Sequence, residues 1–153
     1  MSKKLSSSEA RALGIIDSAK IMPNGERRAR ITNGTLSASV TVLPREGRSG
    51  WQAAHYHKHA SECYLVYSGF VVLVSRTIFG TLRYECLEPG KKCTVQPGIS
   101  HALFLTNGAE LVTIKHTPQS TEPDWHRDTE LDQELEHVDM DSLGQILSRS
   151  IAA

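Results

Sequence analysis

Hydrophobic and polar positions alternate along much of this 153-residue chain, in short runs separated by turn-forming residues. The clearest alternation covers residues 35–42, where apolar and hydroxyl-bearing side chains take turns. The apolar members are Leu36, Ala38, Val40 and Val42, and the polar members are Ser37, Ser39 and Thr41. Successive residues of a strand point to opposite faces of a sheet, so this segment is predicted to be a half-buried strand.

Residues 55–116 continue as short apolar runs that end at glycine, proline or asparagine turn signals about every ten residues. The expected strands cover residues 64–67, 71–78, 82–87, 93–96, 102–105 and 111–114. Short strands at this spacing are typical of an all-β sandwich or barrel.

Helical signals are confined to the two ends of the chain. Ser6 and the residues after it offer helix-capping chemistry, and Leu13, Ile15 and Ile16 could give a short helix an apolar face. Helices are also expected over residues 128–138 and 141–151. A chain of this length fits a single domain. We therefore expect an N-terminal helical and polar arm (1–24), a β-barrel (25–118) and an acidic C-terminal tail with helices (119–153).

Charge and cysteine content narrow the class of protein. Lys and Arg balance Asp and Glu at 17 each, whereas a nucleic-acid-binding chain needs a positive field, so no nucleic-acid partner is expected.

Residues 1–8 lack the apolar core of a signal peptide, no run is long enough to span a membrane, and the three cysteines show no paired spacing. We expect a soluble cytoplasmic protein with reduced thiols.

The balanced total hides an acidic segment between residues 117 and 142, which carries nine acidic side chains and one arginine. Such a block usually forms a solvated tail. The alternative is that it docks on the basic N-terminal region of its own or a partner chain.

The most distinctive chemistry lies in residues 55–62, which contain His55, His57, His59 and Glu62, with His101 further along the chain. Imidazole nitrogens and carboxylate oxygens are common ligands of divalent transition metals. His55 and His57 would share one face of a strand, and a turn over residues 58–61 would return Glu62 to it and leave His59 at the rim. If the strand instead continued through His59, the same-face pair at the site would be His57 and His59.

These residues resemble the sequence motifs of the cupin superfamily. The run from His55 to Gly69 has the spacing of its first motif, and Gly90 with Pro97-Gly98-x2-His101 is similar to its second, although Pro97 and Asn107 depart from the usual spacing. The resemblance implies a cupin β-barrel (a double-stranded β-helix or jelly roll), metal ligands His55, His57, Glu62 and His101, and a homodimer. The ion would be one divalent transition metal such as Zn, Fe, Ni or Mn.

Three functions are compatible with such a site. The first is a metal-dependent enzyme for a small polar molecule, an isomerase, epimerase or lyase for a sugar or organic acid, in which the metal polarises a carbonyl or enolate. The second is a dioxygenase that uses Fe or Ni, and the third is a non-catalytic small-molecule binding or sensing protein. Tyr64, on the same strand face as Glu62, and His59 at the rim are the candidate catalytic side chains.

Overall fold

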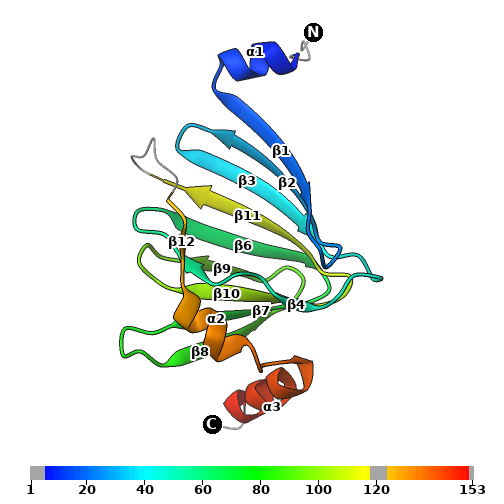
Figure 1. The fold of residues 1–153 in the computed structure, drawn as a ribbon, viewed down its shortest axis with the longest axis vertical. Helices are drawn as coiled ribbons and strands as arrows, with labels where there is room; N and C mark the ends of the chain where they lie inside the picture. Colours follow the sequence, from blue (N-terminus) through cyan, green and yellow to red (C-terminus); the bar gives the residue numbers. More distant parts are fainter. Residues whose placement is uncertain (1–5, 118–123, 152–153) are drawn as a thin grey trace.

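The computed structural model describes residues 6–117 and 124–151 of the chain. Two antiparallel sheets pack face to face, and the helices lie at the ends of the chain (Figure 1). The first sheet has the strand order β1-β2-β3-β11-β6-β9. Its strands are β1 (Ile15–Ile21), β2 (Arg27–Asn33), β3 (Leu36–Val42), β11 (Glu110–His116), β6 (Ser61–Ser68) and β9 (Lys92–Val95).

The second sheet has the order β12-β5-β10-β7-β8, and β4 also pairs with β10. Its strands are β4 (Gly50–Trp51), β5 (His55–Tyr56), β7 (Val71–Arg76), β8 (Leu82–Leu87), β10 (His101–Leu105) and β12 (His126–Arg127). The predicted all-β barrel is therefore confirmed, and each strand expected between residues 64 and 114 is present with small shifts at its ends.

Gly69 shows why the turn after β6 needs glycine. Its φ angle is +67°, and a Cβ atom at this position would lie 2.8 Å from the Cα atom of Ala109. A side chain is thus disfavoured both by backbone conformation and by the neighbouring backbone. The glycine that ends the first histidine-containing segment is required by the fold.

The N-terminal helix is shorter than the sequence suggests. α1 covers Ser7–Ala12 and begins with a capping box between Ser6 and Glu9, as its sequence indicates. The chain then turns at Gly14 and enters β1, which pairs with β2 along its whole length. Ile15 and Ile16, expected on a helix, thus belong to a strand, because pairing with β2 overrides weak helical spacing.

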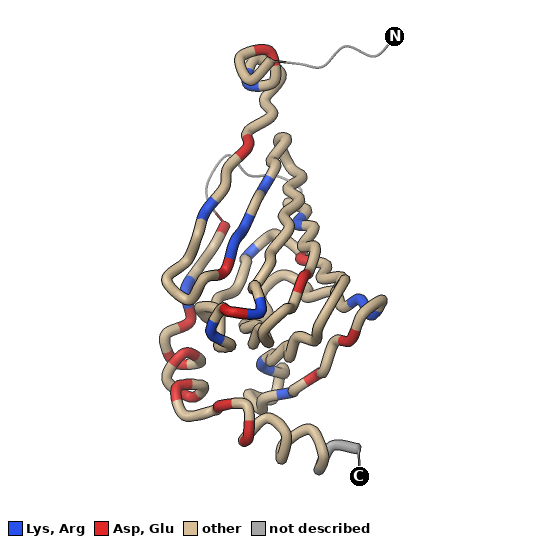
Figure 2. The backbone as a smooth tube through the Cα atoms, turned by 90° about the vertical axis from the view of Figure 1, so that its right-hand side faces the viewer, with Lys and Arg blue, Asp and Glu red and all other residues tan. Residues whose placement is uncertain are grey.

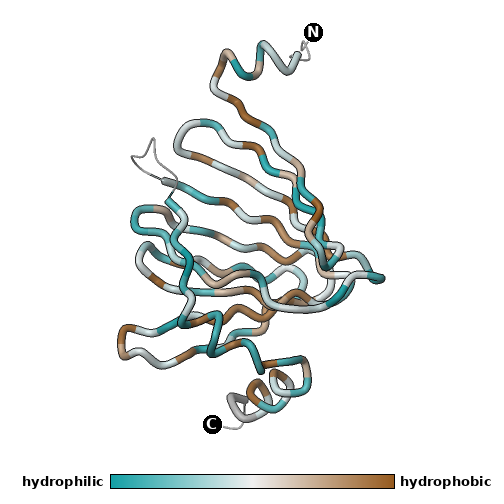
Figure 3. Tube along the Cα trace, viewed as in Figure 1, coloured by the Kyte–Doolittle hydropathy of each residue, from teal (hydrophilic) through white to brown (hydrophobic). Residues whose placement is uncertain are grey.

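The C-terminal helices cover the outer face of the second sheet. α2 (Thr129–Leu135) packs Leu131 and Leu135 against Val74 and Ala102, and α3 (Met140–Ile151) packs Leu143 against the sheet. This sheet is buried on both faces, which explains the unbroken apolar runs of β7 and β10 (Figure 3). Both helices lie close to their predicted positions.

The acidic C-terminal segment is attached to the barrel where the structure describes it. Acidic residues lie along α2 and along the connection to α3 (Figure 2), yet the leucines of the same helices are buried. Asp124, at the start of this segment, is itself only 7% exposed. Most acidic side chains of the described segment are exposed, as expected for a solvated segment, but its leucines and Asp124 also make specific contacts with the barrel. None of the described helices is long and apolar enough to cross a membrane.

β3 is the half-buried strand that its alternation predicts, but the polar side is the buried one. Ser37, Ser39 and Thr41 point into the barrel and are at most 8% exposed, whereas Leu36 and Val40 are each 48% exposed. Apolar residues fill the other end of the barrel, between the two sheets. The end near β3 is a polar chamber, which reverses the usual reading of such an alternation.

Candidate metal centre

β5 and β10 place two of the predicted histidines directly opposite each other. His55 pairs with His101 across the antiparallel strands, and their ring centroids are 4.5 Å apart. His57 follows β5, with its ring centroid 5.1 Å from that of His55. The turn at Gly98 fixes the second segment against the first, since the N–H of Gly98 donates to the carbonyl of His57 at 2.6 Å.

Glu62, on β6, lies at the centre of these rings. Its carboxylate oxygens are 3.6 Å from Nε2 of His55, 3.2 Å from Nε2 of His57 and 3.3 Å from Nε2 of His101. The bend over residues 58–60 returns the chain to the barrel interior, as the spacing from His57 to Glu62 predicts. The structure thus brings all four predicted ligands together.

Each histidine uses its other ring nitrogen to bind a backbone carbonyl. Nδ1 of His55 lies 3.0 Å from the carbonyl of Ala53, and Nδ1 of His101 lies 3.0 Å from that of Ile99. Nδ1 of His57 contacts the carbonyl of Asp124. A carbonyl oxygen only accepts hydrogen bonds, so each Nδ1 carries a proton, and the lone pair of a neutral ring in this position is on Nε2. Metal-ligating histidines are commonly oriented in this way.

The charges at the centre favour a cation between these groups. Burial acts to raise the pKa of Glu62, but contacts from the three histidines and Tyr64 hold it well below its usual range, so the carboxylate is ionised. Burial, together with the charge of His101, lowers the pKa of His55, which favours the neutral ring. A neutral Nε2 and a carboxylate oxygen both present lone pairs, and they repel unless a positive group is shared between them.

A metal ion fits this donor set. Donor atoms of His55, Glu62 and His101 all lie within 4.8 Å of one another and could hold one ion. His57 lies outside this closest group, but its Nε2 is buried and forms no hydrogen bond with the described residues. Neutral imidazoles and one carboxylate suit first-row divalent metals. That all four residues act as ligands remains a prediction.

Asp124 and Trp125 belong to the site but lie outside the predicted set. The Asp124 carboxylate accepts backbone hydrogen bonds from Lys58, His59 and Ala60 at 2.8–2.9 Å, which fixes the bend between His57 and Glu62. Trp125 stacks on His55 with ring centroids 5.4 Å apart. A tryptophan inside an otherwise charged segment is the one sequence signal that could have indicated this contact.

The two candidate catalytic side chains have different surroundings. Tyr64 is 2% exposed, donates a hydrogen bond to Glu62, and has its hydroxyl 2.8 Å from Nε2 of His101. Burial and the nearby Glu62 charge raise the pKa of Tyr64 well above its usual value, so the phenol keeps its proton. The side chain of His59 is exposed, and its catalytic role remains a prediction.

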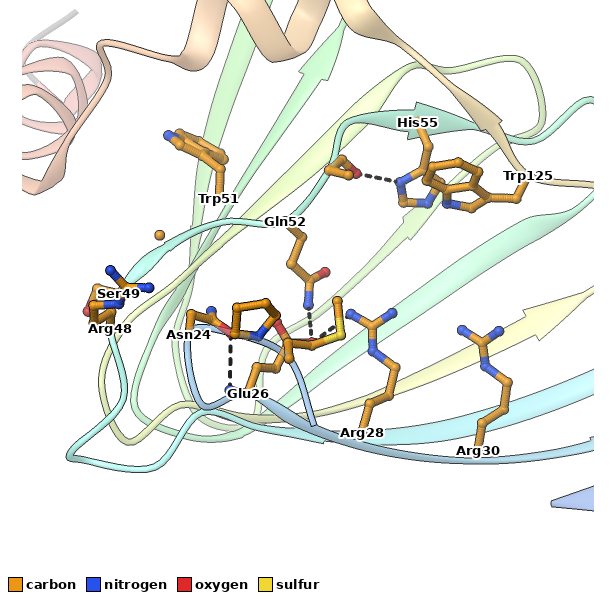
Figure 4. Close-up of a pocket in the computed structure, with 14 residues that line it drawn as sticks. Asn24, Glu26, Arg28, Arg30, Arg48, Ser49, Trp51, Gln52, His55 and Trp125 are labelled. Carbon is orange, nitrogen blue, oxygen red and sulfur yellow. Dashed lines mark hydrogen bonds and ion pairs between the residues drawn. The ribbon is translucent and has the colours of Figure 1, made fainter. Parts of the chain in front are cut away.

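Two cavities with shared lining residues lie beside the centre. An inner cavity of about 110 Å³ is lined by His55, His57, Glu62 and Tyr64, and an outer cavity of about 760 Å³ shares His55 and Trp125 with it. Arg28 and Arg30 line both cavities, and their side chains rise from β2 toward Gln52, His55 and Trp125 (Figure 4).

Lys115 also lines the inner cavity. Burial lowers its pKa, the nearby charge of Arg30 acts in the same direction, and that of Glu62 opposes both. Sequence reasoning missed Lys115 and both arginines, although the Arg28-x-Arg30 spacing places the two guanidinium groups on one strand face.

Comparison with solved structures finds oxalate decarboxylases among the similar folds. A single-residue variant of the Bacillus subtilis enzyme aligns over 80% of this chain and 37% of its own, with a TM-score of 0.61 and 14% identity. The formate complex of the Lactobacillus farciminis enzyme aligns over 86% of this chain and 39% of its own, with a TM-score of 0.60 and 16% identity. This chain thus spans well under half the length of these relatives. No protein-family model and no curated protein matches the sequence.

These similarities, with the strand order and the two motifs, establish the fold. The chain is a small cupin-fold protein, and the centre between its sheets is a candidate site for one metal ion.

Proposed function

We propose that this protein is a metal-dependent enzyme that acts on a small polar molecule, as an isomerase, epimerase or lyase of a sugar or organic acid. The observation that carries the proposal is the orientation of the three histidines. Each has its Nδ1 tied to a backbone carbonyl and its Nε2 directed at Glu62. Three such rings form a preorganised donor set, which a merely structural cluster does not need.

The protein residues around the centre suit proton transfer beside a carbonyl group. A bound divalent ion would polarise a carbonyl or stabilise an enolate. Tyr64 lines the inner cavity and keeps its proton, so its hydroxyl can donate a hydrogen bond to an oxygen that gains negative charge. Trp125 and His55, which stack on each other, line both cavities.

Two of the structural neighbours support a metal and a small acid as ligands. One of the similar Bacillus subtilis oxalate decarboxylase structures comes from work on the Mn(II) centres of that enzyme, and the Lactobacillus farciminis structure is a formate complex. Manganese is therefore a reasonable first ion to test here, beside Zn, Fe and Ni. The reaction of this chain is a separate question, because one fold supports many chemistries.

The test is exchange of carbon-bound hydrogen with solvent. Metal-loaded protein is incubated in D2O with a panel of hydroxy acids, keto acids and sugars, and deuterium next to the carbonyl is followed by NMR. We expect exchange that requires metal, that is lost in His55→Ala, and that falls at least tenfold in Tyr64→Phe. His116→Ala, which alters an exposed histidine of β11, is the matched control. His59→Ala tests the predicted role of His59.

Exchange that is unchanged in His55→Ala would overturn the enzyme proposal. Oxygen consumption by the iron- or nickel-loaded protein, in place of exchange, would favour the dioxygenase function. Ligand affinity without turnover would favour the binding function.

We also propose that the protein is a homodimer formed through the outer face of the first sheet. No described helix covers this face, and it exposes apolar side chains across four adjacent strands. They are Ile31, Leu36, Val40, Ile114 and Leu65, each 42–57% exposed. A continuous apolar sheet face of this kind is unusual on a monomer. A second copy of the same face matches it in shape and chemistry, because two-fold pairing brings the same strands together.

Sedimentation velocity tests the dimer. The wild-type protein should sediment as a dimer, and Val40→Lys should sediment as a folded monomer. Ile78→Lys, which adds the same charge at a position that is 86% exposed in the β7–β8 turn, should remain dimeric. A monomeric wild-type protein at about 100 μM, far above the Kd of a stable dimer, would contradict the proposal.

A further inference from the structure

Three positively charged side chains converge on the inner cavity, and only part of their charge is balanced. Arg28 is paired with Glu26 at 2.7 Å, and Gln52 donates to the same carboxylate oxygen at 3.0 Å. The side chains of Arg30 and Lys115 have no hydrogen bond or ion pair among the residues that the structure describes. Glu62 is the one acidic residue among those that line this cavity.

Sheet register explains how these cations face the metal centre. Arg30 pairs with Ser39, Ser39 pairs with Thr113, and Thr113 pairs with Tyr64, so these four residues form one row across the inner face. In the adjacent row Lys115 stands between Ser37 and Glu62. The hydroxyl groups of these rows give the chamber polar walls between the cations and the candidate ligands.

We propose that the inner cavity binds a small carboxylate through Arg30 and Lys115, with the other end of the molecule at the metal centre. This inference names the substrate class of the proposed function and therefore rests on it. Converging cations whose side chains lack partners within the described residues make a site for an anion, and a guanidinium group binds a carboxylate with two parallel hydrogen bonds. A divalent ion at Glu62 would increase the positive charge of the cavity further.

The cavity size favours a carboxylate of a few heavy atoms. Its volume of about 110 Å³ holds several water molecules, since one water needs ~10–15 Å³ of such space. The larger outer cavity, with Trp51 and Trp125 on its wall, would admit the molecule from solvent (Figure 4). Arg28 keeps a buried Nε atom without a hydrogen bond, and this atom is a further donor on the same wall.

The test is calorimetric titration of malonate into metal-free and zinc-loaded protein, with malonamide as the uncharged analogue and inorganic phosphate as a competing anion. Malonate should bind both forms, and more tightly when zinc is present. Arg30→Gln and Lys115→Gln should each weaken malonate binding about tenfold or more, as expected for the loss of a charge-assisted hydrogen bond.

The matched control is Arg27→Gln, which removes the same charge from the same strand at an exposed position. It should change malonate affinity less than twofold, and circular dichroism should show that each variant is folded. Arg30→Lys keeps the charge but loses the paired hydrogen bonds, so its affinity should fall between those of wild type and Arg30→Gln.

Equal malonate affinity in wild type, Arg30→Gln and Lys115→Gln would overturn the inference. So would malonamide binding as tightly as malonate, or phosphate binding more tightly than malonate. If zinc fails to bind while malonate still requires Arg30, the metal proposal fails and the carboxylate site stands. If zinc binds and malonate does not, the carboxylate inference fails and the metal proposal stands.

Discussion

Replacing Asp124 with asparagine should destabilise the protein and loosen its metal centre. The Asp124 carboxylate holds the bend between His57 and Glu62 through three backbone N–H groups. Burial acts to raise its pKa, but those hydrogen bonds outweigh burial and lower the pKa from 3.8 to about 2. At ~1.4 kcal/mol per pKa unit, this difference corresponds to roughly 2.5 kcal/mol of folding free energy.

The sign of the effect follows from the lowered pKa. The folded state favours the ionised carboxylate, so its stabilisation is complete above the unfolded pKa of 3.8 and is lost as pH falls to about 2. At pH 7, Asp124→Asn should therefore lose about 2 kcal/mol, which moves the midpoint of urea unfolding by roughly 1 M for a protein of this size. The difference in unfolding free energy between wild type and Asp124→Asn should decrease as the pH is lowered from 5 to 3.

Urea unfolding followed by tryptophan fluorescence measures this difference. Asp17→Asn is the matched control, because the Asp17 side chain is exposed on β1 and has no hydrogen bond or ion pair within the described part of the chain. It should change the free energy of unfolding by less than about 0.5 kcal/mol. Metal affinity of Asp124→Asn should fall about tenfold or more, as for other residues that orient ligands. An unfolding free energy equal to that of wild type at pH 7 would refute the reasoning.

Two further perturbations probe other parts of the account. Gly69→Ala should cost more than 2 kcal/mol in chemical unfolding, since it adds a Cβ atom at positive φ and against the backbone of Ala109. Gly34→Ala, at φ +55° in open space, should cost only about 1 kcal/mol, and equal losses would contradict the steric argument. Burial lowers the pKa of His55 below 6.5, so the metal-free protein should lose stability as pH falls below that value. His55→Asn should show a smaller difference between unfolding at pH 7.5 and at pH 5.5, and an unchanged pH dependence would show that His55 is not the group responsible.

The sequence predicts the strands between residues 64 and 114 well because their signals are local, whereas it does not predict β1 and β2. Turn residues such as Gly69 and Gly98 mark where strands end, and the short apolar runs between them have the length and composition of strands. The spacing of His55, His57 and Glu62 also carries local geometry, since side-chain direction alternates along a strand and reverses after a bend. His101 follows a Pro-Gly turn, which fixes where its strand begins.

The rest of the site depends on how the sheets close, which no local pattern contains. Arg30 and Lys115 are 85 positions apart by their numbering and meet only because β2, β3 and β11 are neighbours in one sheet. The same closure turns the polar face of β3 inward. In the sequence, Asp124 cannot be distinguished from the other acidic residues of its segment. Only the folded chain places it against the backbone N–H groups of residues 58–60.

The central claim is that His55, His57, Glu62 and His101 bind one divalent metal ion, and metal content tests it most directly. Protein purified without added metal is loaded with Mn or Zn, dialysed, and assayed by elemental analysis together with circular dichroism. We predict one ion per chain in wild type and in His116→Ala, and less than a tenth of that in His101→Ala and His57→Ala. A folded wild-type protein that retains no metal, or a folded His101→Ala that retains as much as wild type, would contradict the account.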